Sequence, residues 1–565
     1  MASAIWTRYR NTVSARQDVS DFLAALALTS LYYGLYTLAE VVGVDAIPRW
    51  PVGYLYLLVL LGGTVFAFLR PGISVLACLA LLPLTRAPEV PHTFTTAPAD
   101  YLMVGIAARV VVMALSDKTL RHRLVSPVAI FLAVSAAAVL SFLVNIAEPD
   151  GLPLKLRIAE TVGISLSALY PFAIVGMIRA ETMKLALVML ITGCAFTVLF
   201  GLLGGLQTIA CLLPTGGDAP FVIPGSRVSG LAADPNQFAA LAVALSAAAA
   251  ALLEFTRASP TVSRVRLPAI VLLLVTGGTI ILAGSRTGMI IYLLFCAIWF
   301  LTSWRQFRLV PVIAACTVAG LSATALWSHL PCPLRDDPLI IRFAERNDEA
   351  AVLARMAGQD VGAPTEQHLT NTFSQAIETL PKKVIQKDGA GGEGGEGGEE
   401  EVSRQFVTDF AATLADETWK LAAAIGADSA RQNLWHFAVL LWGEKPLFGW
   451  GPGNMAAQTP NGWRAHNTVL TTAAEMGTVG VGALVLTAAI VVVVTVRRLR
   501  YSTVGWRGWL LLLTGLVVLS LSAMSQDSLR QGAVWAFAGL VLCLPPPLHR
   551  SKLGSAGDLS TAGRH

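Results

Sequence analysis

The sequence has little charge, few cysteines and no cluster of metal-binding residues. Only 14% of its 565 residues are charged, against roughly a quarter in soluble domains, and 55% are hydrophobic. None of the seven cysteines forms a Cys-x-x-Cys pair and no His-rich tract is present, so neither a zinc site nor a disulfide framework is indicated. The net charge of +5 is too modest to predict a nucleic-acid surface. What remains is a polytopic membrane protein.

Long apolar runs dominate the chain. About fourteen of them reach the roughly 15 to 25 residues that a bilayer crossing needs. The predicted fold is therefore an all-α membrane protein, a polytopic bundle of about 12–14 transmembrane helices with one large extracytoplasmic loop. The runs lie near 22–43, 52–69, 72–86, 100–116, 125–144, 158–179, 185–213, 236–256, 268–284, 287–303, 309–327, 467–496, 508–525 and 531–547.

Basic residues predict the orientation of these spans. If residues 1–21 lie in the cytoplasm as an uncleaved start, the basic loops "DKTLRHR" and "RRLRYSTVGWR" both fall inside, as the positive-inside rule requires. We then expect about eleven spans in 22–327, a large extracytoplasmic loop at 328–466, about three spans in 467–547 and a cytoplasmic tail at 548–565.

The large loop contains two contrasting stretches. Residues 387–401, "KDGAGGEGGEGGEEE", have no hydrophobe and are expected to form a flexible acidic insert. In contrast, the stretch ending in "SARQNLWHFAVLLWGEKP" has apolar residues at helical spacing. Its apolar face, which includes Leu434, Phe437 and Leu441, is expected to lie against the membrane surface. Neither an internal repeat of fixed period nor paired broken helices indicate a transporter built from two halves.

Three arginines stand on the predicted outer side, where topology does not explain them. They are Arg227 in "GSRVSGLAADPNQFA", Arg286 in "LAGSRTGM" and Arg431 in "SARQNLWHFAVLLW". Structural alternatives are contact with lipid headgroups for Arg227, a carboxylate partner for Arg286 and a solvated helix face for Arg431. Following Arg227, Asp234 or Asn236 can cap the next helix.

His466 closes the large loop immediately before an apolar span. Asn467 or Thr468 can serve as the N-cap of that span, so free backbone N–H groups and the positive end of the helix dipole meet the imidazole there. Such a helix end attracts phosphate. Glu475 is nine residues further on, about half a helical rotation away, which favours helix packing or pairing with an arginine over direct orientation of His466.

Four segments in order resemble the core of the O-antigen ligase and O-antigen polymerase superfamily. They are "RVSGLAADPN", "GSRTG", "RQNLW" with "KPLFGWGPGNM", and "AHNTVLTTAAEMGTVG". Trp435 and Gly451 belong to the third segment, and His466, Asn467 and Glu475 to the fourth. The first seven spans contain no matching motif, and the acidic insert departs from the family's usual loop.

The resemblance implies transfer of a glycan from a polyprenyl (undecaprenyl) diphosphate carrier to a hydroxyl on a glycolipid, glycan or protein acceptor, outside the plasma membrane. It implies an inverting enzyme without metal or cofactor, in which Arg227, Arg286 and Arg431 hold the diphosphate and His466 takes the acceptor proton. Asp234, Asn236, Trp435, Gly451, Asn467 and Glu475 would support the site. A repeat-unit polymerase or a protein O-oligosaccharyltransferase would use nearly the same residues. A lipid-linked glycan flippase is the alternative from another class, with Arg109 as its main candidate within the bilayer.

Overall fold

The structure, a computed structural model, describes most of the apolar helices and part of the large loop. The described residues are 19–35, 49–84, 97–148, 151–179, 182–209, 222–223, 227–228, 235–256, 276–277, 279–280, 283, 285–302, 429–459, 464–501, 506–522 and 532–543. The acidic insert 387–401 and the predicted span 309–327 lie outside these residues.

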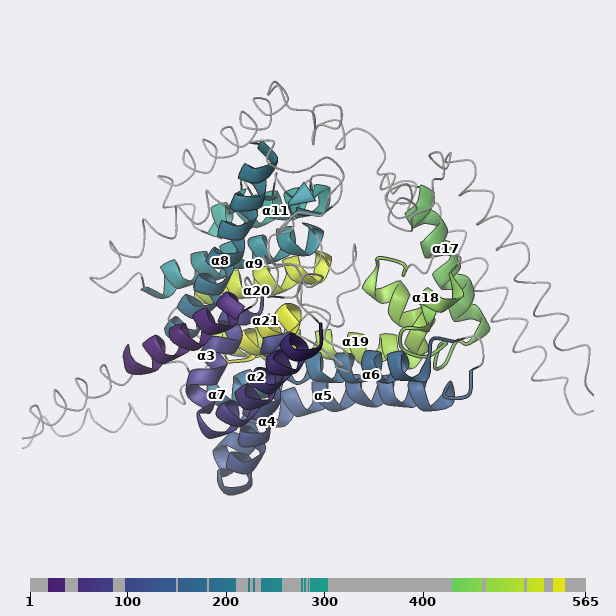
Figure 1. Cartoon of the computed structure of the whole chain (residues 1–565), viewed down its shortest axis with the longest axis horizontal. Helices are drawn as coiled ribbons and strands as arrows, with labels where there is room; N and C mark the ends of the chain where they lie inside the picture. Colours follow the sequence, from purple (N-terminus) through teal and green to yellow (C-terminus); the bar gives the residue numbers. More distant parts are fainter. Residues whose placement is uncertain are drawn as a thin grey trace, which may run out of the picture.

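Within this part of the chain the architecture is a bundle of α-helices (Figure 1). An unlabelled first helix covers Val19–Leu35. The labelled helices are α2 (Arg49–Leu69), α3 (Pro71–Leu81), α4 (Pro98–Ser116), α5 (Lys118–Val144), α6 (Leu154–Ala168), α7 (Tyr170–Met177), α8 (Met183–Ile209), α9 (Pro235–Thr256), α11 (Arg286–Thr302), α17 (Ser429–Glu444), α18 (Asn454–Gln458), α19 (Thr468–Tyr501), α20 (Trp506–Ser522) and α21 (Gly532–Leu542). Two residues each of β1 (Val222–Ile223) and β2 (Arg227–Val228) pair antiparallel, with Ile223 opposite Arg227.

Six of the described helices are long and apolar enough to cross a membrane, and six shorter apolar helices accompany them. The prediction of an all-α polytopic membrane protein is therefore confirmed. Most helices begin and end within a few residues of the predicted runs. The predicted span 158–179 is divided into α6 and α7 at Leu169, where Pro171 stands in the first turn of the second helix.

Helix ends follow ordinary capping chemistry. Asp117 starts α5, and its carboxylate accepts hydrogen bonds from the backbone N–H groups of Thr119 and Leu120, at 2.8 and 3.1 Å. At the same end of the helix, Arg123 donates to the Val175 and Ile178 carbonyls at the end of α7, both at 3.0 Å. The N-terminal part of α5 and the C-terminal end of α7 therefore lie together.

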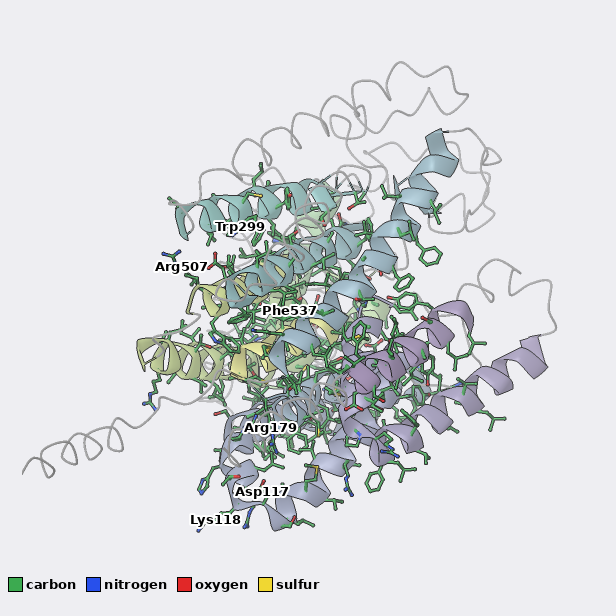
Figure 2. The ribbon with its side chains drawn as sticks, turned by 90° about the vertical axis from the view of Figure 1, so that its left-hand side faces the viewer. Asp117, Lys118, Arg179, Trp299, Arg507 and Phe537 are labelled. Atoms are coloured by element: carbon green, nitrogen blue, oxygen red, sulfur yellow. The ribbon has the colours of Figure 1, made fainter. Side chains whose placement is uncertain are left out.

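Basic residues from distant parts of the chain lie toward one side of the bundle. Figure 2 shows Lys118, Arg179 and Arg507 on its left-hand side. These are residues that the positive-inside rule assigns to a single face.

Helix packing relies on small residues. The alanine-rich helix α9 is the most deeply buried of the six long spans. Gly288 of α11 is so close to α9 that a Cβ built on it would lie 2.5 Å from the Cβ of Ala239. Small residues let apolar helices approach until their backbones nearly touch.

Candidate active site

The span that follows His466 is broken at Gly477. This residue has φ 63° and ψ −162°, a backbone conformation essentially open to glycine alone. Two carbonyl groups before the break leave the helix ladder and accept hydrogen bonds from the preceding loop. Trp450 N–H donates to Ala474 O at 2.9 Å, and Gly451 N–H donates to Glu475 O at 2.8 Å.

The amide groups after the break are also satisfied by that loop. Thr478 N–H donates to Pro446 O at 2.8 Å, and Val479 N–H donates to Leu447 O at 3.2 Å. Residues 445–451, here called the docking loop, thus supply the hydrogen bonds that the helix itself does not make. The sequence analysis predicted a span over 467–496, and the structure has a candidate span at Thr468–Arg497 with a break inside it at Gly477.

Two glycines allow this close approach. A Cβ on Gly477 would overlap the carbonyl carbon of Leu447, and one on Gly449 would overlap the carbonyl carbon of Glu475. Gly449 is also left-handed, with φ 64°. The "FGWG" and "EMG" motifs are therefore two halves of one packed contact.

The end of α5 anchors the docking loop from the other side. The Ser141 hydroxyl lies within hydrogen-bonding distance of the carbonyl oxygens of Phe448, at 2.6 Å, and Glu475, at 2.8 Å. The Asn145 side chain donates to Gly449 O at 3.0 Å. Part of the N-terminal half of the chain is thus built into this unit.

Lys445 fixes the start of the docking loop. Its ammonium group pairs with the Glu148 carboxylate and donates to the Asn145 side-chain oxygen at 3.1 Å. It also lies 3.9 Å from the centre of the Trp450 ring, a cation–π distance. Beside it, burial raises the pKa of Glu444 to about 7, while the nearby positive charge of Lys445 opposes the shift.

Helix α17 packs against α19, and the Trp450 indole of the docking loop donates to its Leu441 carbonyl at 3.0 Å. Figure 1 shows α17 beside α18. Phe437 and Leu441 on the apolar face of α17 pack into a small core, and Leu434 is buried as well, so the predicted contact of these residues with the membrane surface is wrong. The partners of this face come from α18, the segment before His466 and α19: Met455, Ala465 and Ala474. Internal partners for an amphipathic helix cannot be told from its periodicity alone.

His466 lies between α18 and α19, in the turn immediately before α19. It is half-buried, and its φ of 48° makes it the one non-glycine residue with positive φ among those the structure describes. The peptide before it is held because the Trp435 indole donates to Ala465 O at 2.9 Å. After it, Asn467 caps α19, accepting from the backbone N–H groups of Val469 at 3.0 Å and Leu470 at 3.2 Å.

Arg464 connects this turn to two carboxylates. Its guanidinium lies 2.9 Å from Glu160 Oε1 on α6 and 3.7 Å from Glu475 Oε1 on α19. Glu475, for which the sequence favours pairing with an arginine, thus has Arg464 beside it, and only 5% of its side chain is exposed. The unit therefore brings together Trp435, Gly451, His466, Asn467 and Glu475 of the predicted supporting and catalytic residues.

Two other predicted residues stand at a pair of helix N-termini. Asn236 is the second residue of α9, after Pro235. Arg286 is the first residue of α11, which Ser285 caps by accepting from Gly288 N–H at 3.0 Å. The Gly288–Ala239 contact keeps these two starts adjacent.

The remaining predicted residues are described only in part. Arg227 is the first residue of β2 and Arg431 lies in the first turn of α17, but their side chains, like that of Arg286, lie outside what the structure describes. Asp234 is outside the described residues. The diphosphate-binding role of the three arginines stays a prediction. In Figure 1, α9 and α11 lie on one side of the view, and α17 and α18 on the other.

The sequence analysis missed the contribution of α6. Arg157, largely buried, donates to Asn145 O at 2.6 Å and Ile146 O at 3.2 Å, fixing the end of α5. Glu160, one turn later, reaches Arg464. The rule that singled out three outer arginines would also have selected Arg157, since the predicted topology puts its loop on the same side.

The structure also describes Arg109, the main candidate residue for a flippase, and the side chains that could bind a metal ion. The Arg109 guanidinium lies 5.7 Å from the centre of the Phe68 ring, within cation–π range. Among the described residues, no group of three His, Cys, Asp or Glu side chains is arranged to hold a metal ion.

Comparison with known families found a match to part of the chain. Residues 269–485 match the family model described as O-antigen ligase. This range includes Arg286, Arg431, His466 and Glu475, and it ends after the break in α19; the Arg227 motif lies before it. The resemblance drawn from the four motifs is confirmed. No match to the chain was found among curated proteins.

Proposed function

With an O-antigen ligase domain at residues 269–485 as the premise, we propose that this chain is a membrane glycosyltransferase that moves a glycan from a polyprenyl diphosphate-linked donor to an acceptor hydroxyl. The reaction takes place on the extracytoplasmic face of the plasma membrane. The observation that carries the proposal is the family match, because its range contains His466 together with α17, the docking loop and the start of α19.

The contacts between the described residues support a reaction site on the outer side of the membrane. Alternation of the predicted spans puts the end of α5, the start of α6 and the start of α19 on the outer side. These are the elements joined by Ser141, Asn145, Glu160 and Arg464. Residues assigned to the other face, such as Arg123 and Ile178, contact each other at the opposite end of α5.

His466 acts as the general base. The acceptor oxygen forms a bond to the anomeric carbon while its proton passes to the imidazole, and the bond from that carbon to the diphosphate oxygen breaks with its electron pair. One displacement of this kind inverts the anomeric centre. Histidine is a common general base in enzymes because its imidazole can accept and release a proton near neutral pH.

The diphosphate gains negative charge as it leaves, so the donor site needs positive charge. Arg227, Arg286 and Arg431 provide it through charge-assisted hydrogen bonds. The adjacent N-termini of α9 and α11 add helix-dipole ends of the same positive sign. The donor lipid stays in the bilayer while its diphosphate emerges at these helix ends.

Arginine side chains make a divalent cation unnecessary in this scheme. We expect the purified protein to keep its transfer rate in EDTA, measured in detergent with lipid-linked glycan as donor. A chelated protein whose activity is lost and then returns with Mg²⁺ or Mn²⁺ would contradict the metal-free mechanism.

Lipid-linked glycan from a strain without this protein tests the function. A ligase defect leaves long glycans on the polyprenyl carrier, whereas a polymerase defect leaves single repeat units. Mass spectrometry of the extracted carrier lipid distinguishes the two. Accumulation of donor on the cytoplasmic leaflet alone would contradict both and indicate a flippase.

A further inference from the structure

We propose that Glu160, on α6 in the N-terminal half of the chain, is a positioning residue for His466 that acts through Arg464. The inference rests on the proposed function, and it extends the reaction machinery beyond the segment that matches the ligase family, because α6 precedes residue 269.

The contact that carries the inference is the ion pair between Glu160 and Arg464. The two groups are 2.9 Å apart, and their side chains are only 15% and 22% exposed. Glu475 approaches the same guanidinium at 3.7 Å. Arg464 is thus held between α6 and α19, two residues before His466. A well-shielded pair fixes geometry better than a solvated one, because water screens it less.

The backbone at His466 requires such support. A left-handed φ of 48° is sparsely populated by residues other than glycine, and it persists only where the surroundings impose it. Trp435 fixes the carbonyl of Ala465, and the Asn467 cap fixes the start of α19. Arg464 is the third attachment of this turn, and its anchor is Glu160.

The packing around Glu160 is specific to this arrangement. Gly453, left-handed with φ 83°, lies against the Glu160 side chain, and a Cβ there would be 2.7 Å from its Cγ. The loop that follows the docking loop is therefore shaped to leave room for the carboxylate-bearing side chain of α6. Asn454 joins this loop to the segment before α6, because its side-chain oxygen accepts a hydrogen bond from Leu152 N–H at 2.8 Å.

Glu160→Gln removes the charge of the pair while keeping the shape of the side chain. We expect kcat to fall about 10- to 100-fold, since a misplacement of about 1 Å has effects of that size, with KM for the donor unchanged. The assay uses purified protein, lipid-linked glycan extracted from a strain lacking the protein as donor, and membranes of that strain as acceptor. Arg464→Gln should behave alike, and the double variant should be no slower than the slower single one.

Asp117→Asn is the matched control, because it also neutralises a carboxylate next to α5 but at the opposite end of that helix. Its kcat and its thermal midpoint in detergent should both equal those of the wild type. If Glu160→Gln does not accumulate in the cell, Arg464→Gln and Arg464→Lys test the inference instead. Both should have a kcat below that of the wild type at unchanged KM, and Arg464→Lys should keep more of the wild-type kcat than Arg464→Gln.

A Glu160→Gln protein with wild-type kcat, or losses that multiply in the double variant, would overturn the inference. His466→Ala separates this failure from failure of the proposed function. If His466→Ala is inactive while Glu160→Gln is fully active, only the positioning role is wrong. If His466→Ala transfers glycan normally, the assigned base is wrong and the proposed mechanism falls with it.

Discussion

Replacing His466 by alanine should lower the turnover of glycan transfer by roughly 10² or more, the usual size of a general-base contribution. Binding of the lipid-linked donor should be nearly retained, because the imidazole acts on the acceptor hydroxyl. The turn itself should survive, since Trp435 and the Asn467 cap hold it through atoms other than the imidazole. The measurement pairs donor binding to the purified variant with its transfer rate.

Arg286→Ala is the variant with which His466→Ala is compared, because it distinguishes loss of donor binding from loss of proton transfer. Loss of a charge-assisted contact to the diphosphate weakens donor binding and slows transfer together, and Arg286→Lys should recover only part because lysine lacks a planar two-pronged donor. If His466→Ala loses donor binding as severely as Arg286→Ala, the histidine is a phosphate ligand and the base lies elsewhere. If neither variant affects transfer, the site is assigned wrongly.

Gly477→Ala should lower the rate of glycan transfer by about 10²-fold or more. It should also lower the thermal midpoint of the protein in detergent. An alanine at φ 63° and ψ −162° is strained by about 1–3 kcal/mol. Its Cβ would also overlap the Leu447 carbonyl, so the docking loop must move. Four backbone hydrogen bonds at the break, each contributing about 1 kcal/mol, would be weakened together.

The same helix provides a control. Gly482 lies five residues further on, and a Cβ there would meet nothing within 4 Å. Gly482→Ala should leave transfer unchanged and raise the thermal midpoint slightly, since alanine is favoured over glycine inside a helix by about 1 kcal/mol. Equal effects of the two substitutions would show that the break at Gly477 has no special role.

The helices were predictable because length and hydropathy decide which segments can cross a bilayer. The starts of α4, α9 and α11 lie within two residues of the predicted runs. The resemblance to the ligase family could also be recognised from the sequence, because the Arg, Trp, Gly and His residues of its motifs occur in a fixed order. Capping by Asn467 followed from its side chain and its place before an apolar run.

Tertiary contacts that cross the chain were not predictable in the same way. The break at Gly477 looks like an ordinary helical glycine until the docking loop lies against it. Likewise, Glu160 belongs to no motif, and its partner is about three hundred residues away in sequence, so neither spacing nor periodicity connects them. The amphipathic face of α17 had the right pattern but the wrong partner, because a protein core and a membrane surface select the same residues.

The dependence of α19 on the docking loop has a consequence for biogenesis. Inside lipid an interrupted helix exposes backbone groups that cost several kcal/mol each when unsatisfied. Both sources of the missing hydrogen bonds, the end of α5 and residues 445–451, precede the break in the chain and are synthesised before it. When α19 leaves the translocon, its hydrogen-bonding partners have already been synthesised. The backbone groups at the break can therefore be paired as the segment enters the bilayer. If a rearranged gene encoded α19 ahead of these segments, the same helix would enter the membrane with the backbone groups at its break unpaired.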